Sequence, residues 1–212
     1  KEDREVMAAY EPLGIIPGQK YNPENVKIDG KKFREVAQKI QNEYLGKLID
    51  PNLIKTMAHK MFKTKGLTDL ETILTVSIIG PIGLPMEEAM YPNVTSETGE
   101  SLNALNDYVV KMTKEQLPPD QAFWSLTLYD KANGFFIPND RKKYSVGENG
   151  GYKINKDGGI EIYIAAEKPS GVPEENWLPI IRKDEEIDLI LRVYVPDLVK
   201  METWKAPKAK KL

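Results

Sequence analysis

Hydrophobic and polar residues alternate strictly along residues 123–130, Phe-Trp-Ser-Leu-Thr-Leu-Tyr-Asp. A period of two is typical of a β-strand whose two faces meet different surroundings. Trp124, Leu126 and Leu128 share one face and are expected to be buried. The opposite face carries hydroxyl groups, which a packed core does not favour. Residues 160–165 and 188–195 repeat this division, so the pattern predicts a sheet with one apolar face and one polar, tyrosine-bearing face.

The same period extends over much of the C-terminal half. Further strands are expected at 108–112, 134–137 and 152–155. Glycine-containing turns suited to hairpins fall between strands, at 133–134, 149–151 and 157–159. Many short strands with such turns predict a jelly-roll-like β-sandwich, which we place at residues 93–204. The chain is therefore expected to be mostly β, and α+β overall.

Residues 1–92 have a helical period instead, and we expect a three-helix segment that packs on the sandwich or on a partner. Within 31–48, apolar side chains recur at steps of three and four, which predicts an amphipathic helix. Its stripe consists of Phe33, Val36, Ile40, Tyr44 and Leu48. The sequence Asp50-Pro51 is expected to end this helix, because proline cannot continue the backbone hydrogen bonding.

Two more helices complete the predicted segment. One begins at Pro51 or Asn52 and carries Met57 and Met61 on its buried side. The last runs from Thr68, a predicted N-cap with Glu71 three residues later, to Ile79. Its apolar residues are expected to be buried on nearly all sides, namely Leu70, Ile73, Leu74 and Ile78. The basic tail at 205–212 is expected to be disordered or to act as a docking arm.

Composition narrows the possible functions. The 212 residues are 41% hydrophobic, which is enough for a core, and 30 basic against 32 acidic residues give no electrostatic signature of nucleic-acid binding. No apolar stretch reaches the roughly 20 residues of a membrane span. Cysteine is absent, and the single histidine, His59, cannot build an ordinary zinc site, so no metal or cofactor is expected. A first residue of Lys1 rather than Met suggests a processed or truncated product.

The C-terminal half resembles a known family in the order of its aromatic and turn residues. The matching segments are 123–130, Gly134-Phe135-Phe136-Ile137-Pro138-Asn139, 141–147, 160–164, Asn176-Trp177-Leu178-Pro179, 191–194 and Thr203-Trp204. They are similar to domain-of-unknown-function family 1214. The resemblance implies a β-sandwich or jelly roll, no established activity, and export to the periplasm or beyond. It also implies a companion N-terminal domain, numbered 1254, in one longer polypeptide; residues 13–92 resemble the segment that joins the two.

The polar faces of three strands supply the candidate ligand site. Flat tyrosine rings flanked by hydroxyl and guanidinium groups suit sugars and other small polar ligands. The predicted ligand-binding residues are Ser125, Thr127, Tyr129, Tyr163, Arg192, Tyr194 and, in a loop, Trp177. Two structural alternatives stay open. A second layer would cover this face, with Glu161 paired to Arg192, and Trp177 would close the open end of the sandwich.

A catalytic set is the alternative to simple binding. Asp130, Arg141, Tyr144 and Glu161 would supply acid, base and orienting roles in a hydrolase or lyase acting on a carbohydrate-like or small polar substrate. In a purely structural role, Asp130 would open the turn closed by Asn133-Gly134, and Arg141 would support the return strand.

The sequence as a whole favours a binding or assembly module without catalytic activity. We expect it to form a homo-oligomer through the helical segment or to bind the companion domain. No nucleic-acid partner is expected. A structural shell component is the third possibility, because jelly rolls often assemble edge to edge.

Overall fold

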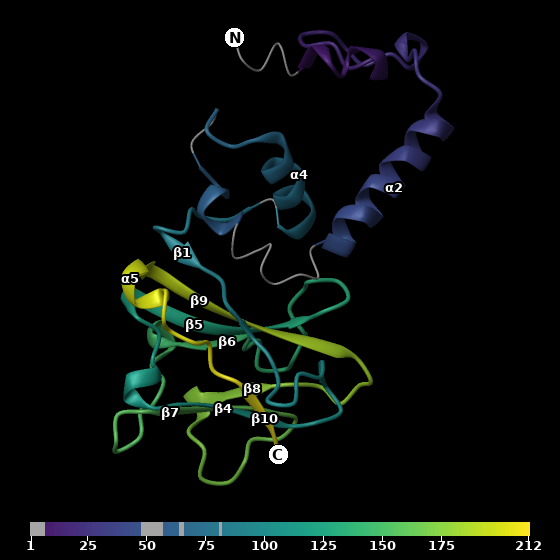
Figure 1. Cartoon of the computed structure of the whole chain (residues 1–212). Helices are drawn as coiled ribbons and strands as arrows, with labels where there is room; N and C mark the ends of the chain where they lie inside the picture. Colours follow the sequence, from purple (N-terminus) through teal and green to yellow (C-terminus); the bar gives the residue numbers. More distant parts are fainter. Residues whose placement is uncertain (1–6, 48–56, 64–65, 81) are drawn as a thin grey trace. The chain divides into compact units, whose positions relative to one another are not determined.

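The computed structural model describes residues 7–47, 57–63, 66–80 and 82–212. The chain divides into two compact units (Figure 1). The first, the helical unit, takes in the chain up to Met57 and residues 69–81. The second, the sandwich unit, consists of residues 58–68 and everything from Ile82 onward. The two units are described separately below.

Two α-helices dominate the helical unit: α2 (Gly30–Lys47) and α4 (Leu70–Ile79). Each begins at an aspartate whose carboxylate accepts backbone N–H groups that lack a partner within the helix. Asp29 accepts from Lys31 at 2.8 Å, and Asp69 accepts from Thr72 at 2.8 Å. Asp69 is therefore the N-cap of α4, not Thr68 as the sequence suggested. Two short 3₁₀ turns precede α2, namely η1 (Glu11–Leu13) and η2 (Pro23–Asn25).

The predicted helix at 31–48 is confirmed up to Lys47, and Leu48 lies outside the described residues. The helix predicted from Pro51 is outside them up to residue 56, and the 3₁₀ turn η3 (Ala58–Lys60) follows. Burial in α4 differs from the prediction: Leu70 and Ile73 are exposed, whereas Thr72 and Thr75 are buried. The Thr75 hydroxyl can be buried because it donates to the Glu71 carbonyl at 2.8 Å.

The sandwich unit contains two sheets. In the first, β9 (Glu186–Pro196) pairs antiparallel with β5 (Asp120–Asp130), and β6 (Ser145–Gly147) pairs antiparallel with the other side of β5. Three two-residue strands follow one another along the free side of β9, namely β1 (Ala89–Met90), β2 (Asn93–Val94) and β3 (Leu102–Asn103). We call this sheet A.

The second sheet, sheet B, has the order β10-β4-β7-β8. Its strands are β10 (Ala209–Lys211), β4 (Tyr108–Met112), β7 (Ile160–Ala165) and β8 (Trp177–Pro179). The pair β7–β8 is parallel and the other pairs are antiparallel, so the sheet is mixed. The fold is therefore sandwich-like and α+β, with helices before the strands.

Alternation along the strands produces the core between the sheets. Trp124, Leu126 and Leu191 of sheet A and Ile162 of sheet B belong to one buried cluster and are at most 1% exposed. The predicted inward face of residues 123–130 is thus confirmed. The residues between them point away from this core.

Several local predictions differ from the structure. Residues 134–137 contribute only the single bridge of Phe136 to Tyr129, and 152–155 form no strand. The basic tail is ordered in part: β10 pairs with β4, and Ala209, 1% exposed, donates its N–H to the Thr95 carbonyl at 2.9 Å. Trp177 lies on a strand, β8, and not in a loop.

We predict that Leu126→Ala lowers the free energy of unfolding by about 2–5 kcal/mol, because Leu126 is fully buried between the sheets. Urea denaturation measures this loss. The matched control is Leu105→Ala, since Leu105 is 53% exposed and its truncation should cost less than about 1 kcal/mol. Equal losses in the two variants would contradict the assignment of the core.

Candidate ligand-binding site

The outward face of sheet A forms the floor of a hollow of about 540 Å³. It lies over β5, β6 and β9, and the segment that leads into β6 contributes one wall. The lining residues are Ser125, Thr127, Tyr129, Phe136, Lys142, Lys143, Tyr144, Ser145, Arg192 and Tyr194. We call this hollow the sheet A pocket.

Strand register brings the polar floor together. Ser125 lies opposite Arg192 on β9, and Thr127 lies opposite Ser145 on β6. Directly opposing side chains in an antiparallel sheet are neighbours, so the hydroxyl groups and the guanidinium group share one surface. Gly147, opposite Ser125, allows β6 to approach β5 closely, because a Cβ there would lie 2.5 Å from the Trp124 carbonyl oxygen and 2.8 Å from the Ser125 Cβ.

Three stacked rings form the wall of the sheet A pocket. Tyr129 and Phe136 have centroids 5.2 Å apart, and Phe136 and Tyr144 have centroids 4.8 Å apart at 9°. The Arg192 guanidinium also lies over the Tyr129 ring, 5.3 Å from its centroid. Tyr129 therefore has two neighbours over its ring, Phe136 and Arg192, and Phe136 also has two, Tyr129 and Tyr144. Among the described residues Tyr144 stacks only on Phe136, so its ring has the most room for a ligand.

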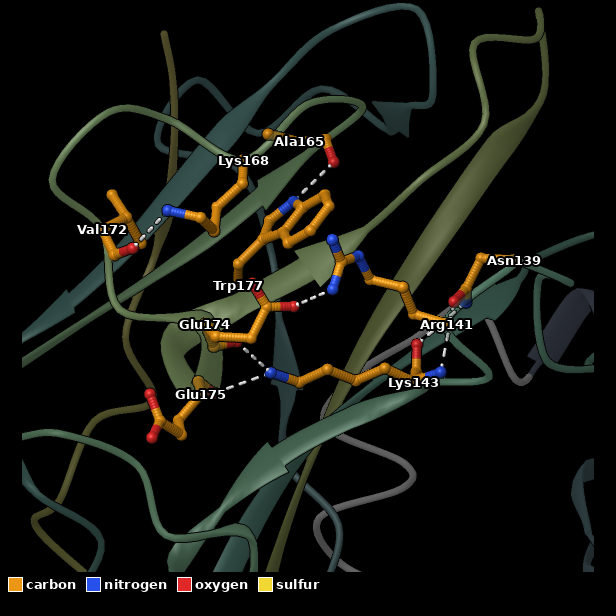
Figure 2. Close-up of polar contacts among 9 residues, drawn as sticks. All are labelled: Asn139, Arg141, Lys143, Ala165, Lys168, Val172, Glu174, Glu175 and Trp177. Carbon is orange, nitrogen blue, oxygen red and sulfur yellow. Dashed lines mark hydrogen bonds and ion pairs between the residues drawn. The ribbon is translucent and has the colours of Figure 1, made fainter.

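The charged groups of the pocket are all basic: Lys142, Lys143 and Arg192. Of the described residues, none with a carboxylate lines it. The Lys143 ammonium is engaged elsewhere, because it donates to the carbonyls of Glu174 and Glu175 at 2.5 and 3.0 Å (Figure 2). Burial lowers the pKa of Lys143. Arg192 and Lys142 are therefore the cations that remain for a ligand.

A set of contacts ties the pocket wall to the neighbouring loop (Figure 2). Arg141 forms an ion pair with Glu174 at 2.5 Å and lies 4.9 Å from the centre of the Trp177 ring. The Trp177 indole N–H donates in turn to the Ala165 carbonyl at 2.8 Å. Asn139 closes the turn by accepting from the Lys143 N–H at 3.1 Å. These contacts hold residues 139–144 where Tyr144 can complete the stacked wall.

Five predicted ligand residues line the sheet A pocket: Ser125, Thr127, Tyr129, Arg192 and Tyr194. The other two lie elsewhere. Tyr163 belongs to β7 in sheet B, and Trp177 is only 6% exposed. Four lining residues were missed, namely Phe136, Lys142, Lys143 and Ser145. Ser145 begins a three-residue strand, which is too short for alternation to be visible in the sequence. Phe136 is placed by its bridge to Tyr129, and Lys142 and Lys143 depend on the turn at 139–142.

The four catalytic candidates do not meet in one pocket. Glu161, on β7, accepts hydrogen bonds from Lys111 at 2.7 Å and from the Tyr163 hydroxyl at 2.6 Å, and it is not paired with Arg192. Asp130 accepts from the Ala132 N–H at 2.8 Å and from the Asn133 amide at 2.5 Å. The hydrogen bond from Asn133 lowers the pKa of Asp130.

Of the remaining two candidates, Arg141 forms the ion pair with Glu174, and Tyr144 lines the sheet A pocket. Asp130 therefore has the turn contacts of the structural alternative, whereas Arg141 contacts Glu174 and Trp177 and not a return strand. The described residues contain no group of three histidine, aspartate or glutamate side chains placed to hold a metal ion. His59 is exposed on η3. No helix within the described ranges is both long and apolar enough to cross a membrane.

Comparison with known proteins identifies the family. Residues 88–198 match the proteins of unknown function grouped as DUF1214. The chain belongs to this family. The DUF1214 region includes β1, β9 and every strand between them, and so the whole floor of the sheet A pocket. A comparison with curated proteins finds no significant match.

One solved structure agrees with this fold. The crystal structure of the VPA0106 protein from Vibrio parahaemolyticus is similar, with a TM-score of 0.64 at 24% identity. The match covers 99% of this chain but 51% of that one, so the present DUF1214 chain spans about half its length. An uncharacterised protein from Burkholderia cenocepacia gives a TM-score of 0.36 at 17% identity, covering 58% of this chain and 28% of that one.

We predict a pH-dependent role for Glu161 in stability. Hydrogen bonds from Lys111 and then Tyr163 lower the pKa of Glu161 below its ordinary 4.5. A carboxyl group with a lowered folded-state pKa stabilises the protein above its unfolded pKa, and this effect disappears as the pH falls through the folded pKa. Glu161→Gln should therefore cost about 0.5–1 kcal/mol at neutral pH and almost nothing in acid well below the usual carboxyl pKa.

Urea denaturation of the wild type and of Glu161→Gln, from neutral pH down to acid, measures the difference in their free energies of unfolding. The control is Glu167→Gln, because Glu167 is exposed and forms no ion pair within the described residues. A deficit for Glu161→Gln that is constant with pH would show that the ionised carboxylate is not the stabilising group.

Proposed function

We propose that this DUF1214 chain is a binding module that takes a small polar ligand, such as a carbohydrate, in the sheet A pocket. One observation carries the proposal. Within the described parts of the chain, no protein group hydrogen-bonds to the side-chain hydroxyls of Ser125, Thr127 and Ser145, although all three line the pocket. The volume of the sheet A pocket, about 540 Å³, is within the usual range of small-molecule sites.

A hydrolase or lyase is the alternative, and the geometry supports it less. General acid–base catalysis needs titratable groups within hydrogen-bond reach of one substrate. Asp130 is engaged in its turn, and Glu161 belongs to the other sheet. Tyr144 alone of the four candidates lines the sheet A pocket. Binding without chemistry requires only the hydroxyl floor and the ring wall, and both are present.

We also propose that the sandwich unit is a jelly roll. The central position of β9 in sheet A, between the early strands β1, β2 and β3 and the middle strand β5, supports this topology. Alternation of the chain between the two sheets supports it as well. The parallel pair β7–β8 departs from the antiparallel pattern of a regular jelly roll.

We propose that the partner of the chain is a second copy of itself, bound through α2. Phe33, Val36 and Ile40 lie on one stripe of the helix and are 48%, 48% and 39% exposed. A contiguous apolar stripe on a helix favours contact with a second apolar surface. A second copy of the chain provides such an apolar surface, its own α2 stripe, without any further component. The companion domain implied by the resemblance is the alternative partner.

We predict that Thr127→Val weakens ligand binding about tenfold, because it removes one hydrogen bond to the ligand, and leaves folding intact. The Thr127 hydroxyl has no protein partner to lose, so a methyl group of similar shape should not destabilise the free protein. NMR titration of the labelled chain with a panel of monosaccharides measures binding, and urea denaturation measures stability.

Tyr163→Phe is the matched control for that experiment. It also removes one hydroxyl group from an outward-facing strand position, but on sheet B. Binding should be unchanged in this variant. If no sugar in the panel shifts the amide signals of β5, β6 and β9, or if both variants bind as the wild type does, the proposed site is wrong.

We predict that Ile40→Glu shifts the chain from an oligomer to a monomer, because it places a charge on the exposed stripe of α2. Light scattering coupled to size-exclusion chromatography measures the mass. Lys39→Glu is the control, since it introduces the same residue beside the stripe. A wild-type chain that is strictly monomeric at high concentration would contradict the self-association.

A further inference from the structure

Arg192 is a half-buried cation without an ion-pair partner. Across the described residues, no carboxylate lies within 4.0 Å of its guanidinium group, and its one hydrogen bond goes to the Tyr129 hydroxyl at 2.5 Å. A guanidinium group carries five N–H donors in a fixed fork. Most of these donors therefore remain for another acceptor, and placing a charge away from water is costly unless something pairs with it.

The surroundings of Arg192 offer no internal acceptor. The other charged groups of the sheet A pocket are the basic Lys142 and Lys143. Asp188 shares the outward face of β9, but within the described parts of the chain it forms no ion pair with Arg192. The Arg141 side chain provides a contrast, because its positive charge is paired with Glu174. Arg192 is thus available to an acceptor that the chain does not supply.

The acceptor that fits this position is an oxyanion. Carboxylate and phosphate groups bind a guanidinium fork through two parallel hydrogen bonds. Ser125 lies directly opposite Arg192 across the β5–β9 ladder and lines the same pocket, so its free hydroxyl is available to the same ligand. Lys142, exposed at the rim, adds positive charge to the approach.

We infer that the ligand of the sheet A pocket is an acidic, hydroxyl-rich ring compound, such as a sugar acid or a sugar phosphate, held by its oxyanion on Arg192. This inference rests on the proposed function, since it names the charge of the ligand bound at the same site. The ring hydroxyls then meet Thr127 and Ser145, and the ring meets Tyr144, one face of which is not stacked within the protein wall. Carboxylate and phosphate share this chemistry, and separate probes distinguish them.

The test is an NMR titration of the labelled full chain with three probes: glucuronate, glucose 6-phosphate and glucose. We expect at least one of the acidic probes to bind about tenfold or more tightly than glucose and to shift the amide signals of β5, β6 and β9. Arg192→Gln should remove this preference, so that neither acidic probe binds more tightly than glucose does to the same variant. Arg34→Gln is the matched control, because it makes the same change on α2, outside the pocket.

The possible outcomes distinguish the inferred charge of the ligand from the proposed binding site itself. If glucose binds as tightly as both acids, the inferred charge of the ligand is wrong and the binding site remains. If Arg34→Gln reduces the preference as much as Arg192→Gln does, the preference is a general charge effect and the role of Arg192 is wrong. If none of the three probes shifts the signals of the pocket, both this inference and the proposed function are contradicted.

Discussion

The pairing of β5 with β9 is the constraint on which the sandwich unit depends. The two strands are hydrogen-bonded neighbours from Phe123 and Tyr194 to Asp130 and Ile187. Along this ladder every second side chain enters the core, and burial of large apolar groups such as Trp124 and Leu191 stabilises the pairing. Because the register fixes the inward residues, it fixes the outward residues too. The polar floor of the sheet A pocket is therefore a consequence of how the core is packed.

The wall of the pocket depends on a different set of interactions. Residues 139–144 form no strand before β6 begins, and their position is set by side-chain contacts with the loop before β8. Arg141 and Lys143 provide those contacts, and Tyr144, the next residue in the chain, stacks on Phe136. The floor belongs to a continuous strand ladder, whereas one exposed ion pair and a few hydrogen bonds hold the wall, so the wall has more freedom to adjust than the floor.

Period-two alternation was sufficient to predict the core of β5, β7 and β9 and the outward position of most floor residues. It was insufficient to assign strands to sheets, since alternation identifies a face and not a neighbour. Tyr163 and Arg192 are both outward, yet they belong to opposite sheets. Because alternation does not assign a strand to a sheet, Glu161 was considered as an ion-pair partner of Arg192. Its partner across the β4–β7 ladder is Lys111.

Short elements were missed for a related reason. Strands of two or three residues, such as β6 and β8, are too short for a period to be visible. The strand β10 carries lysines on an edge, a composition typical of a solvated tail, and it is held by backbone pairing that no side-chain pattern records. At α4 the predicted N-cap, Thr68, was wrong by one residue: Asp69, which follows it, is the N-cap, and both residue types suit that position.

The most direct test of the division between the two faces is a cysteine scan along β5. The chain contains no cysteine, so each single substitution can be labelled without background. Ser125→Cys and Tyr129→Cys should react with a maleimide in the native protein, whereas Leu126→Cys and Leu128→Cys should react only after unfolding. Equal labelling rates at all four positions in the native protein would contradict the account.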